Sequence, residues 1–229
     1  MENNIYKNRS DLVYETLKQE ILDLRLKPGQ LISEAEICSR FCVSRNPVRD
    51  ALRMLQEQGF VINIPYKGIF ITLLNLNNIK QLIYMRFAVE SMVLRDFMQI
   101  KTPLLLEEIH HLIRVQEAMV QEKTFTPEHF YRIDAQMHSV WFTATGKQKL
   151  WEILQGQQLH YTRYRMLDFV TETDFARIIR DHKHLYQLIE KGDSDSLEAS
   201  LKEHLYYSIT RMRPHIEDEY KDYFENDTI

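Results

Sequence analysis

The chain contains little cysteine, glycine or proline. Its 229 residues include two cysteines, six glycines and six prolines, whereas 44% are hydrophobic and 27% are charged. Two cysteines cannot build the disulfide framework of a small secreted domain. Cys38 and Cys42 lie four residues apart and could form a redox pair or half of a metal site; we interpret them as small core thiols. The composition therefore predicts a folded, helix-rich protein and excludes a disordered chain.

The sequence also lacks a long apolar run. No stretch approaches the ~20 apolar residues that a membrane-spanning helix requires. The first residues, MENNIYKNRSD, contain no apolar core of the kind found in a signal peptide. We therefore expect a cytoplasmic protein without a membrane partner.

The negative charge is unevenly distributed. The formal net charge is −4, but residues 1–75 carry ten Lys and Arg against nine Asp and Glu, whereas the remainder carries 19 against 24. A nucleic-acid-binding first part would depend on cations placed locally rather than on its overall charge. Such binding should be strongly sensitive to salt.

Residues 43–59, VSRNPVRDALRMLQEQG, predict a helix of about fifteen residues. Ser44 is a good N-cap, Pro47 suits the first turn, and Gly59 suits the stop after the helix. Arg45, Arg49 and Arg53 recur every four residues on a different face from the apolar stripe, which consists of Val48, Ala51, Leu52 and Leu55. This basic face is either an ordinary solvated surface or a surface that reads DNA, in which Ser44 and Asn46 would help to hold phosphate.

The neighbouring segments favour DNA binding. Ser33 to Glu36 form a capping box that opens a short helix, and the turn at Cys42 and Val43 leads into the arginine helix. Downstream, the β-branched runs FVINI and IFITL flank residues 65–68 and predict a hairpin with Lys67 and Gly68 at its tip. Residues 1–75 are therefore predicted to form a winged helix-turn-helix domain.

Residues 76–229 have helical periodicity almost throughout. After a polar break at residues 73–78, we expect an antiparallel bundle of six or seven helices. The predicted helices cover about 76–100, 103–122, 126–146, 147–168, 173–191 and 194–213, and Pro214 is expected to end the last of them. The predicted fold class is mainly α, a winged helix-turn-helix with a small β-wing followed by an all-α antiparallel helical bundle.

Four residues of this second region could bind a metal ion. Asp134 and His138 share one face of a helix because they lie four residues apart. His182 and His204 lie on the two long helices that follow. One carboxylate and three imidazoles suit zinc, nickel or manganese, provided that they converge. The alternative is that these are ordinary structural histidines, since the chain has nine.

The motifs of residues 10–73 resemble those of the GntR family of bacterial transcription regulators. The resemblance rests on Pro28-Gly29, the VSRNPVRDAL run and the wing glycine Gly68. It implies that Arg45 and Arg49 contact an operator and that the wing enters the minor groove. Ala35 stands near a position where some members carry a further DNA-contacting arginine.

Residues 76–213 are similar to the all-helical FCD-type effector domain of the FadR-like subfamily. In this resemblance Asp134, His138, His182 and His204 match the metal ligands, and zinc is the ion most expected. Arg86 and Glu90 match a pattern that suits a small carboxylate effector beside the metal, although an ion pair between the two is an equal alternative. Lys147 replaces an asparagine frequent in the family.

The resemblance implies a cytoplasmic homodimer that binds a palindromic DNA operator, acts as a repressor and responds to a small-molecule effector, most plausibly an organic acid. Two alternatives remain. In one the metal ion itself is the signal. In the other the chain is a metal-dependent enzyme fused to a DNA-binding domain, against which the sequence offers no additional general base or nucleophile motif.

Overall fold

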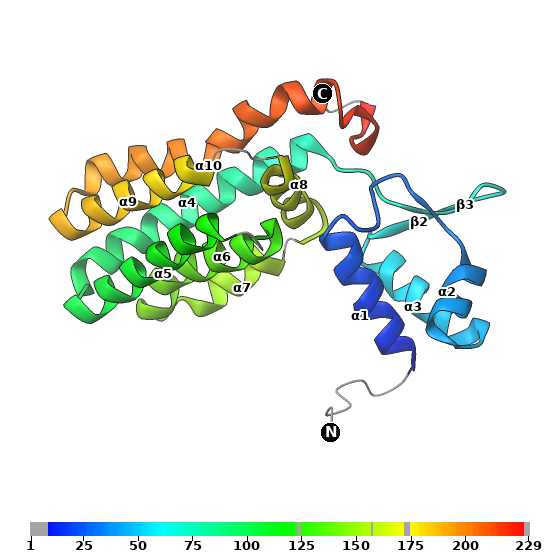
Figure 1. The fold of residues 1–229 in the computed structure, drawn as a ribbon. Coiled ribbons are helices and arrows are strands. Elements are labelled where there is room, and N and C mark those ends of the chain that lie inside the picture. The colour runs from blue at the N-terminus through cyan, green and yellow to red at the C-terminus, as the bar shows by residue number, and fades with distance from the viewer. Residues whose placement is uncertain (1–8, 123–124, 157, 172–174, 227–229) are drawn as a thin grey trace. The chain divides into compact units, whose positions relative to one another are not determined.

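The structure, a computed structural model, describes residues 9–122, 125–156, 158–171 and 175–226 (Figure 1). It divides into two compact units, each of which is described on its own. The N-terminal unit comprises the described residues up to Leu76 together with Gln158–Arg163 and the residues from Ile216 onward, and the helical unit comprises the others. No helix in the described part of the chain is long and apolar enough to cross a membrane.

The N-terminal unit is a winged helix-turn-helix. Its three α-helices are followed by a hairpin, and a short first strand completes an antiparallel sheet of order β1-β3-β2. The elements are α1 (Arg9–Leu22), β1 (Leu31–Ile32), α2 (Glu34–Phe41), α3 (Arg45–Glu57), β2 (Val61–Ile64) and β3 (Gly68–Ile71). The predicted hairpin is confirmed, whereas β1, which pairs Leu31 with Phe70, was not predicted because two residues give no periodicity.

Local sequence explains where the helices of this unit begin and end. The Ser33 hydroxyl accepts a hydrogen bond from the Glu36 N–H at 3.4 Å, which confirms the predicted cap of α2. Ser44 precedes α3, but its side chain makes no capping hydrogen bond. Gly59 follows α3 with φ +78°, a conformation that glycine adopts without strain. Cys42 ends α2 with φ 51° and is exposed, so the interpretation of Cys42 as a core thiol was wrong.

The core of the N-terminal unit lies between α1, α3 and the sheet. It includes Val13, Leu17, Ile21, Ile37, Val48, Ala51, Leu52, Leu55, Phe60, Val61 and Ile71. Glu20 is buried at the edge of this core and accepts hydrogen bonds from Arg40 on α2. This hydrogen bonding to Arg40 lowers the pKa of Glu20 despite the opposing effect of burial, so a charged pair joins α1 to α2.

Two later segments complete the N-terminal unit. One is a single π-helical turn, η1 (Gln158–Thr162), followed by Arg163; the other contains the short 3₁₀ helix η2 (Lys221–Tyr223). Leu74 forms a parallel bridge with Phe224. This bridge could not be predicted from the sequence, because an isolated bridge involves too few residues to produce a strand pattern.

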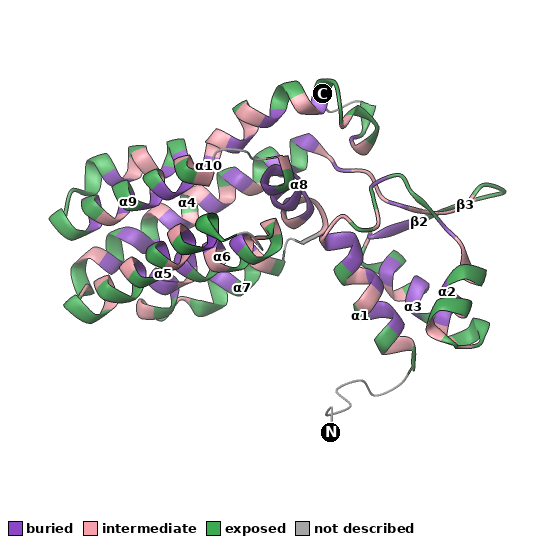
Figure 2. Cartoon of the chain, viewed as in Figure 1, coloured by how far each residue is buried: buried purple, intermediate pink, exposed green. Residues whose placement is uncertain are grey.

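The helical unit contains long helices whose buried faces point toward each other (Figure 2). Thr102 and Thr126 cap two of them by accepting hydrogen bonds from Leu105 and His129, and each is followed by a proline at the first helical position. The α-helices are α4 (Leu76–Ile100), α5 (Pro103–Gln121), α6 (Pro127–Ala144), α7 (Gln148–Gly156), α8 (Arg163–Thr171), α9 (Phe175–Lys191) and α10 (Ser194–Glu217). The predicted all-α bundle is confirmed.

Two predicted helix boundaries were wrong. The single helix expected over residues 147–168 is divided into α7, η1 and α8, and α7 ends at Gly156. Glycine weakens a helix at this point, and the helical periodicity of the sequence continues past it. The last long helix does not stop at Pro214 but continues to Glu217. Ile216 is 2% exposed, and the burial of its side chain supports the extra turn.

Candidate functional site

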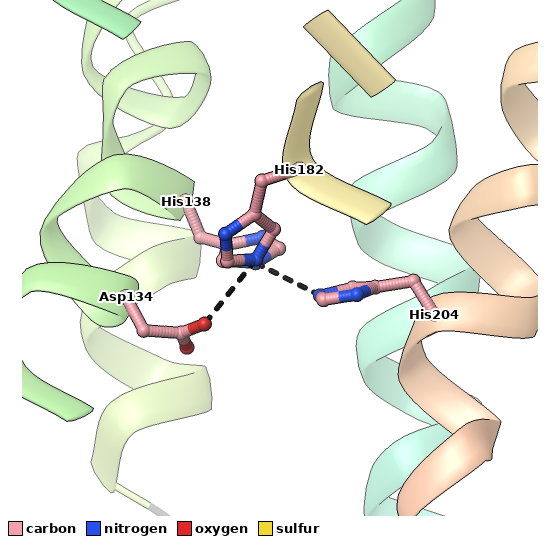
Figure 3. A group of neighbouring side chains, drawn as sticks. All are labelled: Asp134, His138, His182 and His204. Carbon is pink, nitrogen blue, oxygen red and sulfur yellow. Dashed lines mark hydrogen bonds and ion pairs between the residues drawn. The ribbon is translucent and has the colours of Figure 1, made fainter. Parts of the chain in front are cut away.

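Four ligating side chains from three helices meet inside the helical unit. Asp134 and His138 extend from α6, His182 from α9 and His204 from α10 (Figure 3). Each offers one ligand atom, and these atoms all lie within 4.8 Å of one another. All four residues are buried, with exposures of 7% or less. The structure thus brings together every residue that the sequence suggested as a metal ligand.

The spacing of the atoms suits one small ion. Nε2 of His182 lies 3.4 Å from Oδ1 of Asp134, and Nε2 of His204 lies 3.3 Å from Nε2 of His138. An ion with four tetrahedral bonds of ~2.0–2.1 Å would separate its ligand atoms by about 3.4 Å. Oδ1 of Asp134 and Nε2 of His182 are buried without a hydrogen-bond partner in the described part of the chain. A cation between them would satisfy both atoms.

Glu90 on α4 fixes the orientation of His138. One oxygen of Glu90, Oε1, accepts hydrogen bonds from Nδ1 of His138 and from Nε1 of Trp141, the latter at 3.0 Å. The other oxygen accepts from Nε of Arg86 at 2.9 Å. Burial disfavours the charge of Glu90, but His138 and Arg86 outweigh it and lower its pKa to about 2. With its proton on Nδ1, His138 presents the lone pair of Nε2 to the centre of the cluster.

The other two histidines have different partners. Nδ1 of His182 lies 2.8 Å from Oε1 of Gln116, a buried residue of α5. Nδ1 of His204 lies 3.8 Å from Oδ2 of Asp181 on α9. Both partners favour a proton on Nδ1 and leave Nε2 able to bind a cation. Partners of this kind tune the affinity of metal sites and orient the ligands.

Arg165 on α8 holds the carboxylate ligand. Its Nη2 donates to Oδ2 of Asp134 at 3.2 Å, which leaves Oδ1 facing His182. Burial opposes the charge of Asp134, but the neighbouring guanidinium of Arg165 and the imidazoles of His138 and His182 outweigh burial and keep the pKa of Asp134 well below its usual range. Asp134 is therefore ionised, and its Oδ1 faces His182.

Burial keeps two of the imidazoles neutral. It lowers the pKa of His138 and, despite the neighbouring Asp181, lowers that of His204 to about 3. Neutral imidazoles can bind a cation without first losing a proton. Three imidazole nitrogens and one carboxylate oxygen fit zinc, and they also fit nickel or manganese.

Arg86 lies beside the cluster rather than in it. It is buried, donates through Nε to Glu90, and its guanidinium lies 5.8 Å from the ring centroid of Trp151. On the other side of the cluster, a small cavity is lined by Arg165, Asp168, Ile178, Asp181, His204, Tyr207 and Ser208. Sequence reasoning identified Arg86 and Glu90 but missed Gln116, because a lone glutamine carries no distinctive spacing.

A second group of candidate residues lies at the start of α3. Ser44, Arg45, Asn46 and Arg49 are all exposed. Nε of Arg49 donates to Glu34 of α2 at 3.2 Å, so this guanidinium already has an acidic partner in the free protein. In a helix-turn-helix, exposed cations at the N-terminal end of the second helix, here α3, can reach base edges or phosphates in the major groove of DNA.

The turn between β2 and β3 carries Lys67, which is exposed, and Gly68. Gly68 has φ +113°, and a Cβ there would lie 2.8 Å from Cδ1 of Leu31. A larger residue would therefore be strained at this position. Tyr66, which the sequence analysis did not single out, is fully exposed at the tip with φ 63°. An aromatic residue in the predicted turn, between Pro65 and Lys67, was the sequence feature that could have drawn attention to Tyr66.

Both halves of the chain match known families. Residues 9–71 match bacterial regulatory proteins of the gntR family, and residues 81–207 match the FCD domain. The second match alone covers more than half of the chain.

The chain is also similar to transcriptional repressors over most of their length. The chain is 24% identical to the HTH-type transcriptional repressor RspR of Escherichia coli K12, over 94% of this chain and 93% of RspR. It is 24% identical to the gluconate operon transcriptional repressor of Bacillus subtilis, over 83% and 79% of the two chains. The solved structure of E. coli McbR/YncC has the same fold, with a TM-score of 0.68, 16% identity and coverage of 92% and 99%.

We predict that Glu90→Gln destabilises the metal-free protein by about 3–5 kcal/mol. The glutamine keeps the shape of the side chain but places an N–H donor against Arg86 or His138, and it removes the charge that both groups face. Urea denaturation followed by circular dichroism measures the change.

Asp96→Asn is the matched control for this substitution. Asp96 lies on the same helix and pairs with Lys147 at 2.7 Å, but its side chain is 55% exposed. Loss of this exposed ion pair should lower the free energy of unfolding by less than about 1 kcal/mol. Equal effects of the two substitutions would show that Glu90 has no special structural role.

Proposed function

The chain belongs to the GntR family of bacterial regulatory proteins and carries an FCD domain, and from this premise we propose that it is a dimeric repressor controlled by a small carboxylate that binds at a metal-containing pocket. Its relatives are transcription regulators rather than enzymes, so the enzyme alternative is set aside. We assign residues 1–75 to DNA binding and residues 76–229 to metal binding, effector binding and dimerisation.

The buried cluster of Asp134 and three histidines is the observation that carries the metal proposal. Each of the four ligands has a partner on the side away from the cluster centre: Arg165 holds Asp134, Glu90 holds His138, Gln116 holds His182 and Asp181 lies beside His204. When bound, a divalent ion would supply positive charge and open coordination positions for an anionic oxygen. Zinc is our first expectation, ahead of nickel and manganese.

The proposal of a carboxylate effector rests on the charges around the cluster. Arg165 and His204 line a small cavity together with Asp168 and Asp181, so a carboxylate there would depend on the charge of the proposed ion and on hydrogen bonds from Arg165. Arg86 is the second proposed effector contact. Nε of Arg86 donates to Glu90, which in turn accepts from His138. An anion that binds Arg86 would therefore also alter the hydrogen bonding of His138. The name of one relative concerns gluconate, which is itself a carboxylate.

Repression and dimerisation are proposed from different grounds. Two full-length relatives are named as repressors. A two-fold dimer would present two α3 helices to the half-sites of a palindromic operator, and effector binding would change how the two DNA-binding units are held by shifting the population of states. We propose that Ser44, Arg45, Asn46, Arg49, Lys67 and Gly68 contact DNA. The burial of the cluster favours a resident ion over a metal that acts as the signal.

We expect Arg49→Ala to weaken binding to a DNA duplex, selected by the wild-type protein from a random pool, by about 1–3 kcal/mol. The loss should be specific because Arg49 would read a base edge. Fluorescence anisotropy measures the affinity. Arg114→Ala, at an exposed arginine of α5, is the control and should bind like the wild type. An Arg49→Ala protein with wild-type affinity would remove this residue from the interface.

Elemental analysis of untagged protein should find about one divalent ion per chain, as the four converging ligands predict. His182→Ala should lose the ion and melt at a lower temperature, since a bound ion stabilises the native state by mass action. His184→Ala is the control, because His184 is exposed two residues further along α9. A full metal content in His182→Ala would contradict the assignment of His182 as a ligand.

A panel of mono-, di- and tricarboxylates should include at least one that releases the zinc-loaded protein from the selected duplex. Arg86→Met should weaken this response while retaining zinc, because the variant removes a cation and none of the four ligands. Fluorescence anisotropy follows the release. If no carboxylate acts but chelation of zinc does, the ion itself is the signal and the carboxylate proposal fails.

A further inference from the structure

The four residues that follow β3, Thr72–Asn75, are held by parts of the chain far away in sequence; we call them the exit segment. The Leu74 N–H donates to the carbonyl of Tyr223 at 2.8 Å, and the Leu74 carbonyl accepts from Glu225 at 3.0 Å. The Asn75 N–H donates to Nδ1 of His160 at 3.3 Å. The sequence suggested a polar break here, but several backbone groups of this segment form hydrogen bonds within the N-terminal unit.

Arg163 holds the first half of the exit segment. Its Nη1 donates to the carbonyl of Thr72 at 2.7 Å, and its Nη2 lies 3.4 Å from both the Thr72 hydroxyl and the Leu73 carbonyl. Its Nε donates to the Leu159 carbonyl of η1. Arg163 is 0% exposed, and burial lowers its pKa to about 9. Burying the charge of Arg163 costs free energy unless its N–H groups are hydrogen-bonded. The guanidinium is therefore held where these carbonyl and hydroxyl oxygens can accept its hydrogen bonds.

Thr72 connects this cation to the DNA-reading elements. The Thr72 hydroxyl donates to the carbonyl of Gly59, the residue at which α3 stops, at 2.8 Å. The Thr72 N–H donates to the carbonyl of Phe60 at 3.1 Å. Thr72 thus joins the segment after α3 to the end of the wing strand β3, and Arg163 donates to the carbonyl of the same threonine. Displacement of Arg163 would free this junction.

The helix that begins at Arg163 also carries a residue of the candidate metal site. Arg163 is the first residue of α8, and Arg165, two residues later, donates to the proposed ligand Asp134 at 3.2 Å. Arg165 also lies 3.8 Å from Asp168, which accepts a hydrogen bond from Arg211 of α10. Residues two apart in a helix are linked by rigid backbone, so a shift of Arg165 is transmitted along α8.

We propose that Arg163 positions the exit segment and the wing, and that α8 transmits the state of the candidate metal site to this arginine. The positioning role stands on contacts within the N-terminal unit alone, whereas the transmission rests on the proposed metal site. Arg163 and Arg165 share the first turn of α8, so the binding of an ion or anion beside Arg165 would bias the hydrogen bonds that Arg163 makes.

Hydrogen–deuterium exchange of the full chain tests both parts of the proposal. Arg163→Met should accelerate exchange in peptides that cover residues 68–75 by about tenfold, because the variant removes charged donors from buried carbonyls. Arg163→Lys should restore part of the protection. Arg114→Met, at an exposed arginine of α5, is the matched control and should exchange like the wild type.

Zinc ions, added alone, test the transmission. In the wild type, zinc should slow exchange in α6, α9 and α10 and also in the exit segment. In Arg163→Met, zinc should bind to the same content and still slow exchange in α6, α9 and α10. It should no longer slow exchange in the exit segment. Unchanged exchange of residues 68–75 in metal-free Arg163→Met would overturn the positioning role. Protection of the site helices but not of the exit segment in the wild type would overturn the transmission, whereas no protection anywhere would instead contradict the metal site.

Discussion

The stability of the helical unit depends on hydrogen bonds and ion pairs that satisfy the polar side chains buried in its interior. A carboxylate and three imidazoles meet there, and burying such groups is favourable only when each has a partner. On the outer side the partners are Arg165, Glu90, Gln116 and Asp181. On the inner side Nε2 of His204 lies 3.3 Å from Nε2 of His138, and Nε2 of His182 lies 3.4 Å from Oδ1 of Asp134, a spacing into which the proposed cation would fit.

The fold was largely predictable because the apolar periodicity of its helices and the residues that cap them are local features. Ser33 and Thr126 cap helices as expected, and Gly59 ends α3. Predictions failed where tertiary packing decided the outcome. Packing extends α10 past Pro214 to Glu217.

The ligand set could be proposed from sequence, but its convergence could not. The four-residue spacing of Asp134 and His138 fixes one helical face, whereas the distances to His182 and His204 depend on how three helices pack. The identity of each ligand's partner depends on packing as well, and for this reason Gln116 escaped notice.

The central claim is that one ion binds Asp134 and three histidines. X-ray absorption spectroscopy of the zinc-loaded protein tests this claim most directly, because it reports the type, number and distance of the ligand atoms. The account predicts three imidazole nitrogens and at least one oxygen at about 2.0–2.2 Å. A sulfur ligand at about 2.3 Å, from Cys38 or Cys42, or a shell with fewer than three imidazoles would contradict it.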